Sequence, residues 1–491
     1  MIEIIDSITN QAVLDKTIEH FKEKGIILPT FEQMKNPDKI PQKIKDELKN
    51  IGLWDLHPLN LFRITWKNEP TESGGGFGDV NYIEIPKEIT GVNARIFALV
   101  GKYFPTGAHK VGAAYGCLAP RLITGQFDPT YHKAVWPSTG NYCRGGAFDS
   151  HLMGVTAVAI LPEEMSRERF EWLEDIGAQV TATPGSESNV KEIYDECWNI
   201  RQNKPDHIIF NQFDEFGNPA WHYNVTGAAI EEAFEQIANE NSNLAAYVSA
   251  TGSAGTIAAG DYLKTKYPNS KITASEALQC PTLLSNGFGA HRIEGIGDKH
   301  VPWVHNAKNT DVVTAIDDED CMRVLRLFNE PVGHAYLKEA GVDPEVIKDL
   351  HLLGISSIAN ILSAIKTAKY YEMDSDDVIF TVATDSADMY LSRVQELTDE
   401  RGAYKETQAA ADLDRIHGTS VDYMQELTYA DRKKVHNLKY FTWIEQQEKE
   451  LEDLNQLWYD KTIWAKLFNQ PEKWDEMIND FNEKTGLLKN L

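Results

Sequence analysis

FPTGAHKVGAAYG (residues 104–116) places a single lysine, Lys110, within a run of small and apolar residues. A lysine that faces solvent usually has polar neighbours. Lys110 instead follows a Pro-Thr-Gly turn and opens a segment rich in Ala, Gly and Val. We therefore expect Lys110 to point towards the interior of the protein. The segments on either side of it indicate the fold class.

From about residue 91 to residue 400, short apolar and β-branched runs alternate with helical patterns and glycine turns. The runs include KAVW (133–136), GVTAVAIL (154–161), LAAYVSA (244–250) and DVIFTVAT (377–384). This rhythm is typical of βαβ units. It predicts an α/β protein with mostly parallel, helix-covered sheets.

The chain divides into three regions that differ in their sequence pattern. Residues 1–90 form a mostly helical N-terminal extension, residues 91–400 form the α/β core, and residues 401–491 form an acidic, Trp-rich, helical C-terminal extension. We expect the tryptophans of the last region to pack over the core or across a dimer.

Composition excludes several function classes. Among 491 residues, 48 are Lys or Arg and 74 are Asp or Glu, and the resulting charge of −26 disfavours nucleic acid and anionic lipid as partners. No apolar stretch is long enough to span a bilayer, and the N-terminus lacks a signal-peptide pattern, so we expect a cytoplasmic protein. The five cysteines are scattered without a CxxC pair, which predicts neither a disulfide framework nor a metal site.

Chemistry in an open α/β sheet gathers in the loops that follow strands. In AVWPSTGNYCRGGAF (134–148), the loop Ser138-Thr139-Gly140-Asn141 joins a strand to a helix. Hydroxyls, an amide and backbone N–H groups at a helix N-terminus suit a carboxylate. A simple capped turn explains the same residues.

AAYVSATGSAGTIAAG (245–260) is a second strand–loop–helix junction, and its small residues would let backbone amides approach a phosphate. The loop lacks both the P-loop lysine and the GxGxxG pattern, so neither ATP nor NAD is indicated. A tight helix–strand junction is the alternative. A third loop, Thr384-Asp385-Ser386, is weak alone because Asp-Ser is a common helix-cap pair.

Together, these elements meet the needs of a pyridoxal phosphate site. A lysine can form the Schiff base, an anion loop can hold the phosphate, and polar groups can address the ring's phenolic oxygen and pyridine nitrogen. The sequence therefore predicts this cofactor.

Seven ordered segments carry a resemblance to a known family. They are RIFALVGKYFPTGAHKVG, STGN, FNQFDEFGNPAWHYNVTG, GSAGTI, IEGIGDKHVPWV, GISSIAN and TDSADMYLS. They resemble the fold type II pyridoxal-phosphate enzymes, the family of cysteine synthase and the tryptophan synthase β subunit, and most of them are closer to cysteine synthase. The resemblance implies two open, mostly parallel sheets with the cofactor cleft between them, and a smaller sub-domain of about residues 115–225 inserted in the larger one.

The resemblance also implies residue roles. Lys110 would hold the cofactor and then remove the substrate α-proton, Asn141 would bind the ring oxygen, and Ser386 would face the pyridine nitrogen, although Asp385 is adjacent. Gly252, Ser253, Ala254, Gly255 and Thr256 would bind phosphate. The substrate-binding residues would be Ser138, Thr139, Gly140, Tyr142 and Gln212.

Some positions depart from the family pattern. Tyr142 stands where cysteine synthases usually have a small hydroxyl residue, which predicts a reshaped substrate pocket. Arg144 is either a second anion contact or a surface arginine, and His109 either touches phosphate or packs in the core. No glutamate stands where tryptophan synthases activate indole, so tryptophan synthesis is disfavoured.

The implied function is β-elimination or β-replacement on a small β-substituted amino acid through an aminoacrylate, in a cytoplasmic homodimer without a metal. The alternatives are an amino-acid ammonia-lyase or dehydratase of the same fold, and a non-catalytic subunit that docks a partner.

Overall fold

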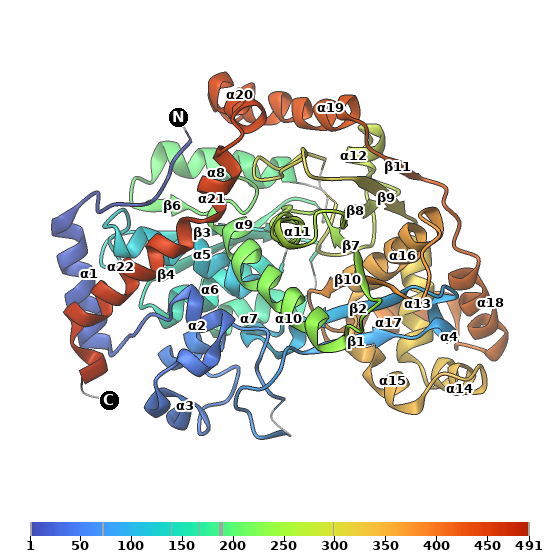
Figure 1. Ribbon diagram of the computed structural model, residues 1–491. Helices are drawn as coiled ribbons and strands as arrows, with labels where there is room; N and C mark the ends of the chain where they lie inside the picture. The colour runs from blue at the N-terminus through green and yellow to red at the C-terminus, as the bar shows by residue number, and fades with distance from the viewer. Residues whose placement is uncertain are drawn as a thin grey trace.

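A computed structural model describes residues 2–70, 73–138, 140–165, 167–185, 190–297 and 299–489, and its strands form two sheets (Figure 1). The larger sheet has seven strands, in the spatial order β1 (Tyr82–Ile85), β2 (Arg95–Val100), β10 (Asp377–Ala383), β7 (Asn243–Ala250), β8 (Lys271–Ala277), β9 (Val312–Ile316) and β11 (Met424–Glu426). Its two edge strands, β1 and β11, pair antiparallel with their neighbours, and the other pairs are parallel.

The smaller sheet is wholly parallel. Its four strands lie in the order β5 (Gln179–Thr183), β4 (Thr156–Pro162), β3 (Lys133–Pro137) and β6 (His207–Ile209). Val135 at the middle of β3 lies opposite Val158 on one side and Ile209 on the other. Such runs of Val, Ile and Ala suit strands that helices cover on both faces. The predicted α/β fold with two open, mostly parallel sheets is confirmed.

Most helices up to residue 285 connect or cover these strands. They are α1 (Gln11–Lys24), α2 (Phe31–Lys35), α3 (Gln42–Leu48), α4 (Lys87–Thr90), α5 (Lys110–Ile123), α6 (Asn141–Leu152), α7 (Arg167–Asp175), α8 (Val190–Asn203), α9 (Gly217–Trp221), α10 (Gly227–Ile237), α11 (Ala258–Lys266) and α12 (Thr282–Ser285). Helices α5 and α6 pack against each other, so the segments that open with Lys110 and Asn141 are neighbours.

The second half adds α13 (Asp318–Asn329), α14 (Pro331–Glu339), α15 (Pro344–Asp349), α16 (Ile355–Tyr370), α17 (Leu391–Arg401), α18 (Glu406–His417), α19 (Tyr429–Lys439), α20 (Leu451–Tyr459), α21 (Ile463–Phe468) and α22 (Gln470–Thr485). In Figure 1, the segment from α18 to α22 runs from the right edge of the molecule over its top to the left side, where α22 lies beside α1. The C-terminal extension therefore spans the molecule from one side to the other in this view.

The tryptophans of this extension pack against the rest of the chain. Trp443 and Trp474 are fully buried, and the Trp474 ring lies 5.4 Å from that of Phe31. Trp474 Nε1 also donates a hydrogen bond of 2.6 Å to the Ile5 carbonyl. The tail thus covers the core, one of the two arrangements that the sequence predicts.

Strand β11 lies in a region where the sequence analysis expects only helices. Its three residues pair with the edge of β9, from Met424 opposite Thr314 to Glu426 opposite Val312. Pairing with a distant strand supplies its hydrogen bonds, and local sequence gives little sign of such a partner. The pairing covers the β9 edge of the larger sheet.

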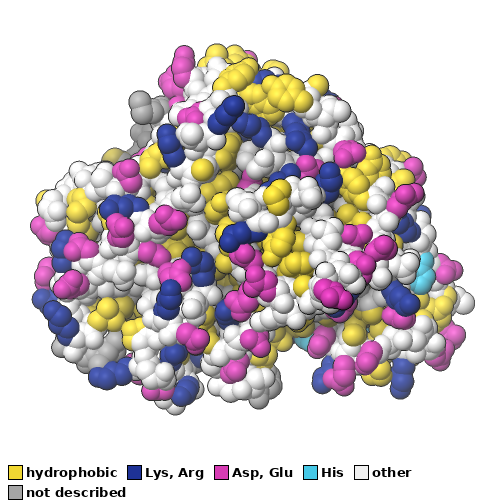
Figure 2. Space-filling model, in the orientation of Figure 1, with side chains coloured by type: hydrophobic (Ala, Val, Ile, Leu, Met, Phe, Trp, Pro, Cys, Tyr) yellow, Lys and Arg dark blue, Asp and Glu magenta, His cyan; other side chains and the backbone are white. Residues whose placement is uncertain are grey.

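Figure 2 shows acidic and basic side chains interspersed over one face of the molecule, without a large region of one sign. In the described part of the chain, no helix combines the length and the apolar character that crossing a membrane requires.

Candidate active site

Lys110 is the first residue of α5 and lies beside residues from two distant loops. Its Nζ donates hydrogen bonds to Ser253 Oγ at 3.1 Å and to Gln212 Oε1 at 3.3 Å. The preceding turn is sharp, because Thr106 has a φ of 67°. Burial lowers the pKa of Lys110 to about 8. A substantial fraction of the amine is therefore neutral near physiological pH.

The start of α5 is fixed by close packing against its neighbours. A side chain at Gly145 of α6 would place its Cβ 2.8 Å from the Val111 nitrogen, and a Cβ at Gly112 would lie 2.2 Å from the Trp221 ring. Only glycine permits these approaches. Packing therefore sets the backbone from which the Lys110 side chain extends.

The Ser138–Asn141 loop lies at the carboxyl end of β3. Ser138 Oγ accepts hydrogen bonds from the Gly140 backbone at 3.2 Å and from Gln212 Nε2 at 3.3 Å. Asn141 Nδ2 donates to Asp385 Oδ2 at 2.7 Å, whereas Asn141 Oδ1 is buried without a hydrogen bond to any described residue. The predicted Thr139 lies outside the described residues.

The loop Gly252–Thr256 joins β7 to α11 and has the properties of an anion site. Among the described residues, no acceptor receives a hydrogen bond from the backbone N–H groups of Ser253, Ala254 and Thr256. Ala254 has a φ of 57°, so this loop adopts a left-handed turn at a non-glycine residue. Free N–H groups at a helix N-terminus attract a negatively charged group such as a phosphate.

Asn218 supports this loop, and the sequence analysis did not identify it. Its Nδ2 donates to Ser253 Oγ at 3.2 Å and to the Gln212 carbonyl at 2.9 Å. A Cβ at Gly255 would lie only 1.9 Å from Asn218 Oδ1. Asn218 thereby ties the phosphate-loop candidate to the segment that carries Gln212.

A cavity lies beside Lys110, and the loop after β10 lines it with Thr384 rather than Ser386. Ser356 at the start of α16 lines the same cavity. Ser386 is buried, but its hydroxyl lies 3.4 Å from Asp388 Oδ2, and it is not among the residues that line the cavity. Asp385 accepts hydrogen bonds from Asn141 and from the Tyr390 hydroxyl, each at 2.7 Å.

Loops from both sheets surround one cavity. The predicted residues that line it are Lys110, Ser138, Asn141, Tyr142, Gln212, Gly252 and Ser253, and it is further lined by Phe213, Gly295, Ile296, Gly297, Ser356 and Thr384. The predicted Ala254, Gly255 and Thr256 lie just beyond, in the same loop as Ser253, and Gly140 adjoins Asn141. The structure thus brings nearly all of the predicted residues that it describes into one place.

Arg144 and His109 take buried positions. Of the two readings of Arg144, the surface arginine is wrong, because Arg144 is buried with its guanidinium 4.6 Å from the centre of the Trp172 ring. His109 is fully buried, its ring lies 4.8 Å from that of His222, and its Nε2 is hydrogen-bonded to Thr384 Oγ1 at 3.1 Å. Burial lowers the pKa of His109 well below its usual value. Among its two predicted readings, the packed core histidine fits these contacts.

This donor set fits pyridoxal phosphate. Three features lie around one cavity: a partly neutral amine for the aldehyde, a loop for the phosphate, and the Asn141 amide oxygen. Within the described residues, three N–H groups of the loop and the Asn141 oxygen have no hydrogen-bond partner. The site offers hydroxyl groups, from Thr384 and Ser356, on the β10 side.

Comparisons with known proteins agree with this fit. The sequence model of the family described as "Pyridoxal-phosphate dependent enzyme" matches residues 76–336. A probable cysteine synthase from Bacillus subtilis is 29% identical over 300 residues, which cover 61% of this chain and 89% of that protein. A cysteine synthase from Staphylococcus aureus is 31% identical over 291 residues, which cover 59% of this chain and 84% of that protein.

A solved structure is similar in fold. The O-acetyl serine sulfhydrylase isoform 3 from Entamoeba histolytica superimposes with a TM-score of 0.56 and 24% identity, covering 69% of this chain and 93% of that chain. The family model ends at residue 336, so it matches no part of the C-terminal extension, residues 401–491.

Proposed function

The chain belongs to the pyridoxal-phosphate dependent enzyme family, and we propose that it catalyses β-elimination or β-replacement on a small β-substituted amino acid, as a cysteine synthase does. One observation carries the proposal: Lys110 Nζ lies 3.1 Å from Ser253 Oγ, in a loop where the backbone N–H groups of Ser253, Ala254 and Thr256 donate to no described residue and could bind an anion. The amine and the anion loop are thus held at one cavity.

The residues that would hold the cofactor are Lys110 through its amine, the Gly252–Thr256 loop through its backbone N–H groups, and Asn141 through its amide. When bound, pyridoxal phosphate supplies an electron-withdrawing ring that stabilises negative charge at the substrate Cα. The assignment of Ser386 to the pyridine nitrogen stays a prediction, and Thr384 and Ser356 are the hydroxyl residues that line the cavity.

The protein's own groups account for the proton transfers and the substrate's orientation. Burial keeps the pKa of Lys110 at about 8, so that the amine can accept the α-proton and later return one near neutral pH. Ser138, Gln212 and the Asn141 helix start lie together beside it, where they would bind the substrate carboxylate. Tyr142, fully buried with its ring against Trp136, narrows this side of the pocket and favours a small substrate.

Departure of the β-substituent leaves an electrophilic β-carbon. Either a nucleophile adds to this carbon, or the product is released and hydrolysed to a keto acid and ammonia. In the first case, the enzyme is a transferase of amino-acid metabolism; in the second, it is a lyase. We propose that access of the nucleophile through the cleft decides between them.

The test is spectroscopic and chemical. Purified protein is titrated with pyridoxal phosphate, and O-acetylserine, serine, cysteine and threonine are then added one at a time, with and without sulfide. We expect a visible absorbance band that responds to one of these amino acids, and either a sulfide-dependent product or release of ammonia.

Lys110→Ala should lose the covalently attached cofactor and the activity, whereas Lys87→Ala, which changes an exposed lysine of α4, should keep both. A wild-type protein that shows no absorbance band with excess pyridoxal phosphate would contradict the proposal.

We further propose a cytoplasmic homodimer. The described structure contains five free cysteines, all buried, which is typical of proteins in a reducing compartment. Sedimentation analysis of the purified protein tests the dimer, and a mass of about 55.3 kDa, that of one chain, would contradict it.

A further inference from the structure

The cleft loop, defined as residues 293–304 without the undescribed Asp298, forms one wall of the active-site cavity. Gly295, Ile296 and Gly297 line the cavity, and both glycines have left-handed backbones, with φ values of 90° and 78°. The loop runs between α12 and β9 and contains no helix or strand. Contacts with other segments must therefore hold its shape.

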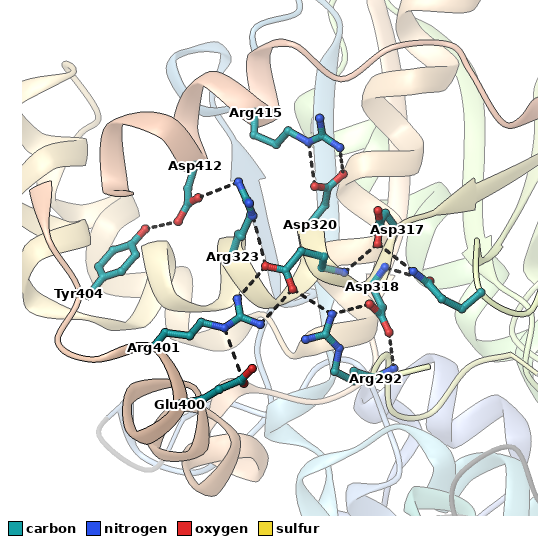
Figure 3. Close-up of polar contacts among 12 residues, drawn as sticks. Arg292, Asp317, Asp318, Asp320, Arg323, Glu400, Arg401, Tyr404, Asp412 and Arg415 are labelled. Atoms are coloured by element: carbon teal, nitrogen blue, oxygen red, sulfur yellow. Dashed lines mark hydrogen bonds and ion pairs between the residues drawn. The ribbon is translucent and has the colours of Figure 1, made fainter. Parts of the chain in front are cut away.

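Ion pairs hold the first end of the loop. The Arg292 backbone N–H donates to Asp318 Oδ2 at 2.9 Å, and its guanidinium binds Asp318 Oδ1 at 2.6 Å and Glu319 Oε2 at 2.9 Å. Figure 3 shows Asp318 and Asp320 at the start of α13. Arg401 of α17 binds Glu319 at 2.7 Å, and Arg415 of α18 binds Asp320 at 2.8 Å.

The C-terminal extension holds the second end. Lys439, the last residue of α19, is fully buried, and its Nζ donates to the carbonyls of Trp303 at 2.9 Å and His305 at 2.7 Å. Trp443 Nε1, one turn further, donates to the Val301 carbonyl at 2.9 Å. Two side chains of the extension thus bind the backbone carbonyls of alternate residues, 301, 303 and 305.

These contacts reach the catalytic lysine through a short path. The Val304 backbone N–H donates to the Phe213 carbonyl at 3.3 Å, and Gln212, the residue before Phe213, accepts the hydrogen bond from Lys110 Nζ. The Phe213 side chain lines the cavity and belongs to the same apolar cluster as Trp303 and Trp443. Movement of the cleft loop would therefore displace the partner of Lys110.

We propose that Lys439 is a positioning residue of the active site, which holds the cleft loop against the Gln212–Phe213 segment and so keeps the substrate pocket formed. This inference rests on the proposed function, since the pocket is the one assigned there to the amino-acid substrate. Preformed pockets bind their ligands more tightly, because less ordering has to accompany binding. Loss of Lys439 should accordingly weaken substrate binding more than it slows the chemical step.

The experiment compares Lys439→Met with Lys434→Met in the full-length protein. Methionine keeps the aliphatic length of lysine but cannot donate to the two carbonyls. Lys434 lies on the same helix and is exposed, so its variant controls for the loss of a positive charge from α19.

Hydrogen–deuterium exchange is measured first, on protein without and with pyridoxal phosphate. Lys439→Met loses two buried hydrogen bonds to backbone carbonyls, and we therefore expect about tenfold faster exchange in residues 299–306. Exchange in β3 should stay unchanged, as should the whole pattern in Lys434→Met. Faster exchange throughout the chain would indicate a merely structural role and overturn the proposal, as would unchanged exchange in the cleft loop.

Kinetics give the second measurement. For Lys439→Met, we expect KM for the amino acid to rise about fivefold while kcat stays within about twofold of wild type, the pattern of lost binding energy. A fall in kcat at unchanged KM would contradict the proposal.

A milder variant keeps the test decisive if Lys439→Met does not fold. Trp443→Phe keeps a smaller aromatic ring in the cluster and removes the N–H that binds Val301, while both hydrogen bonds of Lys439 remain, so it should raise exchange in the same loop by a smaller factor. The exchange result without cofactor does not depend on catalysis. A loop that loosens in a protein that binds no pyridoxal phosphate would refute the proposed function but not the role of Lys439 in holding the loop.

Discussion

Asn141 and Asp385 join the two sheets: the Asn141 amide donates to the Asp385 carboxylate at 2.7 Å, although 244 positions separate them in the chain. Asn141 opens α6 next to the smaller sheet, and Asp385 follows β10 of the larger one. The Tyr390 hydroxyl binds the same carboxylate oxygen. Asp385 is therefore the acceptor that holds a site residue across the cleft.

Replacement of this acceptor should be costly. Asp385→Ala leaves the buried Asn141 amide and Tyr390 hydroxyl without this partner, and we expect the free energy of unfolding to fall by about 2–4 kcal/mol. Tyr390→Phe removes only one of the two hydrogen bonds and should cost about 1 kcal/mol. Urea unfolding of the cofactor-free proteins measures both. Equal losses for the two variants would contradict the bridging role of Asp385.

Attachment of pyridoxal phosphate should depend on pH through Lys110. Burial lowers the pKa of Lys110 to about 8, and only the neutral amine attacks an aldehyde. The attachment rate should rise about tenfold per pH unit from pH 6 to 7 and level off above pH 8. Stopped-flow absorbance between pH 6 and 10.5 measures it. A rise that continues to pH 10.5, where an exposed lysine titrates, would show that Lys110 is not buried as described.

The phosphate-binding loop should not tolerate a methyl group at Gly255. A Cβ there would lie 1.9 Å from Asn218 Oδ1, so Gly255→Ala must displace either the loop or Asn218. We expect the dissociation constant for pyridoxal phosphate to rise at least about tenfold, which corresponds to about 1.4 kcal/mol. The double variant Gly255→Ala with Asn218→Ala relieves the clash and should recover part of the affinity. Fluorescence titration measures both, and an unchanged affinity of the single variant would place the phosphate elsewhere.

The ion-pair cluster at the start of α13 should contribute stability in a pH-dependent way. Despite the cost of burial, hydrogen bonds from Arg401 and Arg292 lower the pKa of Glu319 to about 2. A lowered pKa means that the contribution is fully present above the ordinary value near 4.5 and is lost as the pH falls towards 2.

Thermal unfolding of Glu319→Gln and wild type should therefore differ most near pH 7, and the difference should shrink as the pH falls through 4.5 towards 2. The control is Glu345→Gln, an exposed residue of α15, which should match wild type throughout. A melting-temperature difference that stays constant from pH 7 to pH 2.5 would refute the ionic origin.

Much of the site is predictable because its residues occupy strand–loop–helix junctions. Lys110, Asn141 and Ser253 each lie in or next to a glycine-containing turn between an apolar run and a helix, and this pattern is local enough to be recognised in one sequence. The parallel sheets then bring these junctions together, because the carboxyl ends of parallel strands meet at one edge.

Ser356 and Asn218 were missed because their neighbours give no such signal. Ser356 lies among apolar residues at the start of a helix, a pattern typical of the core. It lines the cavity because α16 packs against β10. Asn218 precedes a proline and reads as a turn residue, while its hydrogen bond to Ser253 spans 35 positions. Their roles depend on tertiary contacts.

The sequence alone also does not determine where certain charged and hydroxyl side chains lie. From the sequence, Arg144 could be a surface residue or an anion contact. Its buried position depends on tertiary packing, because the rings of Trp54 and Trp172, far from each other in the sequence, lie 5.6 and 4.6 Å from its guanidinium. Within the loop after β10, residue type alone does not tell which of Thr384 and Ser386 turns towards the cavity.

The pairing of β11 with β9 has a consequence for synthesis of the chain. An uncovered strand edge is a template for pairing with other chains. The ribosome produces β9 first, and at about 5–20 residues per second several seconds pass before β11 emerges. During that interval the nascent sheet has a bare edge, so the segment that protects this edge from pairing with other chains is made well after the strand that it covers.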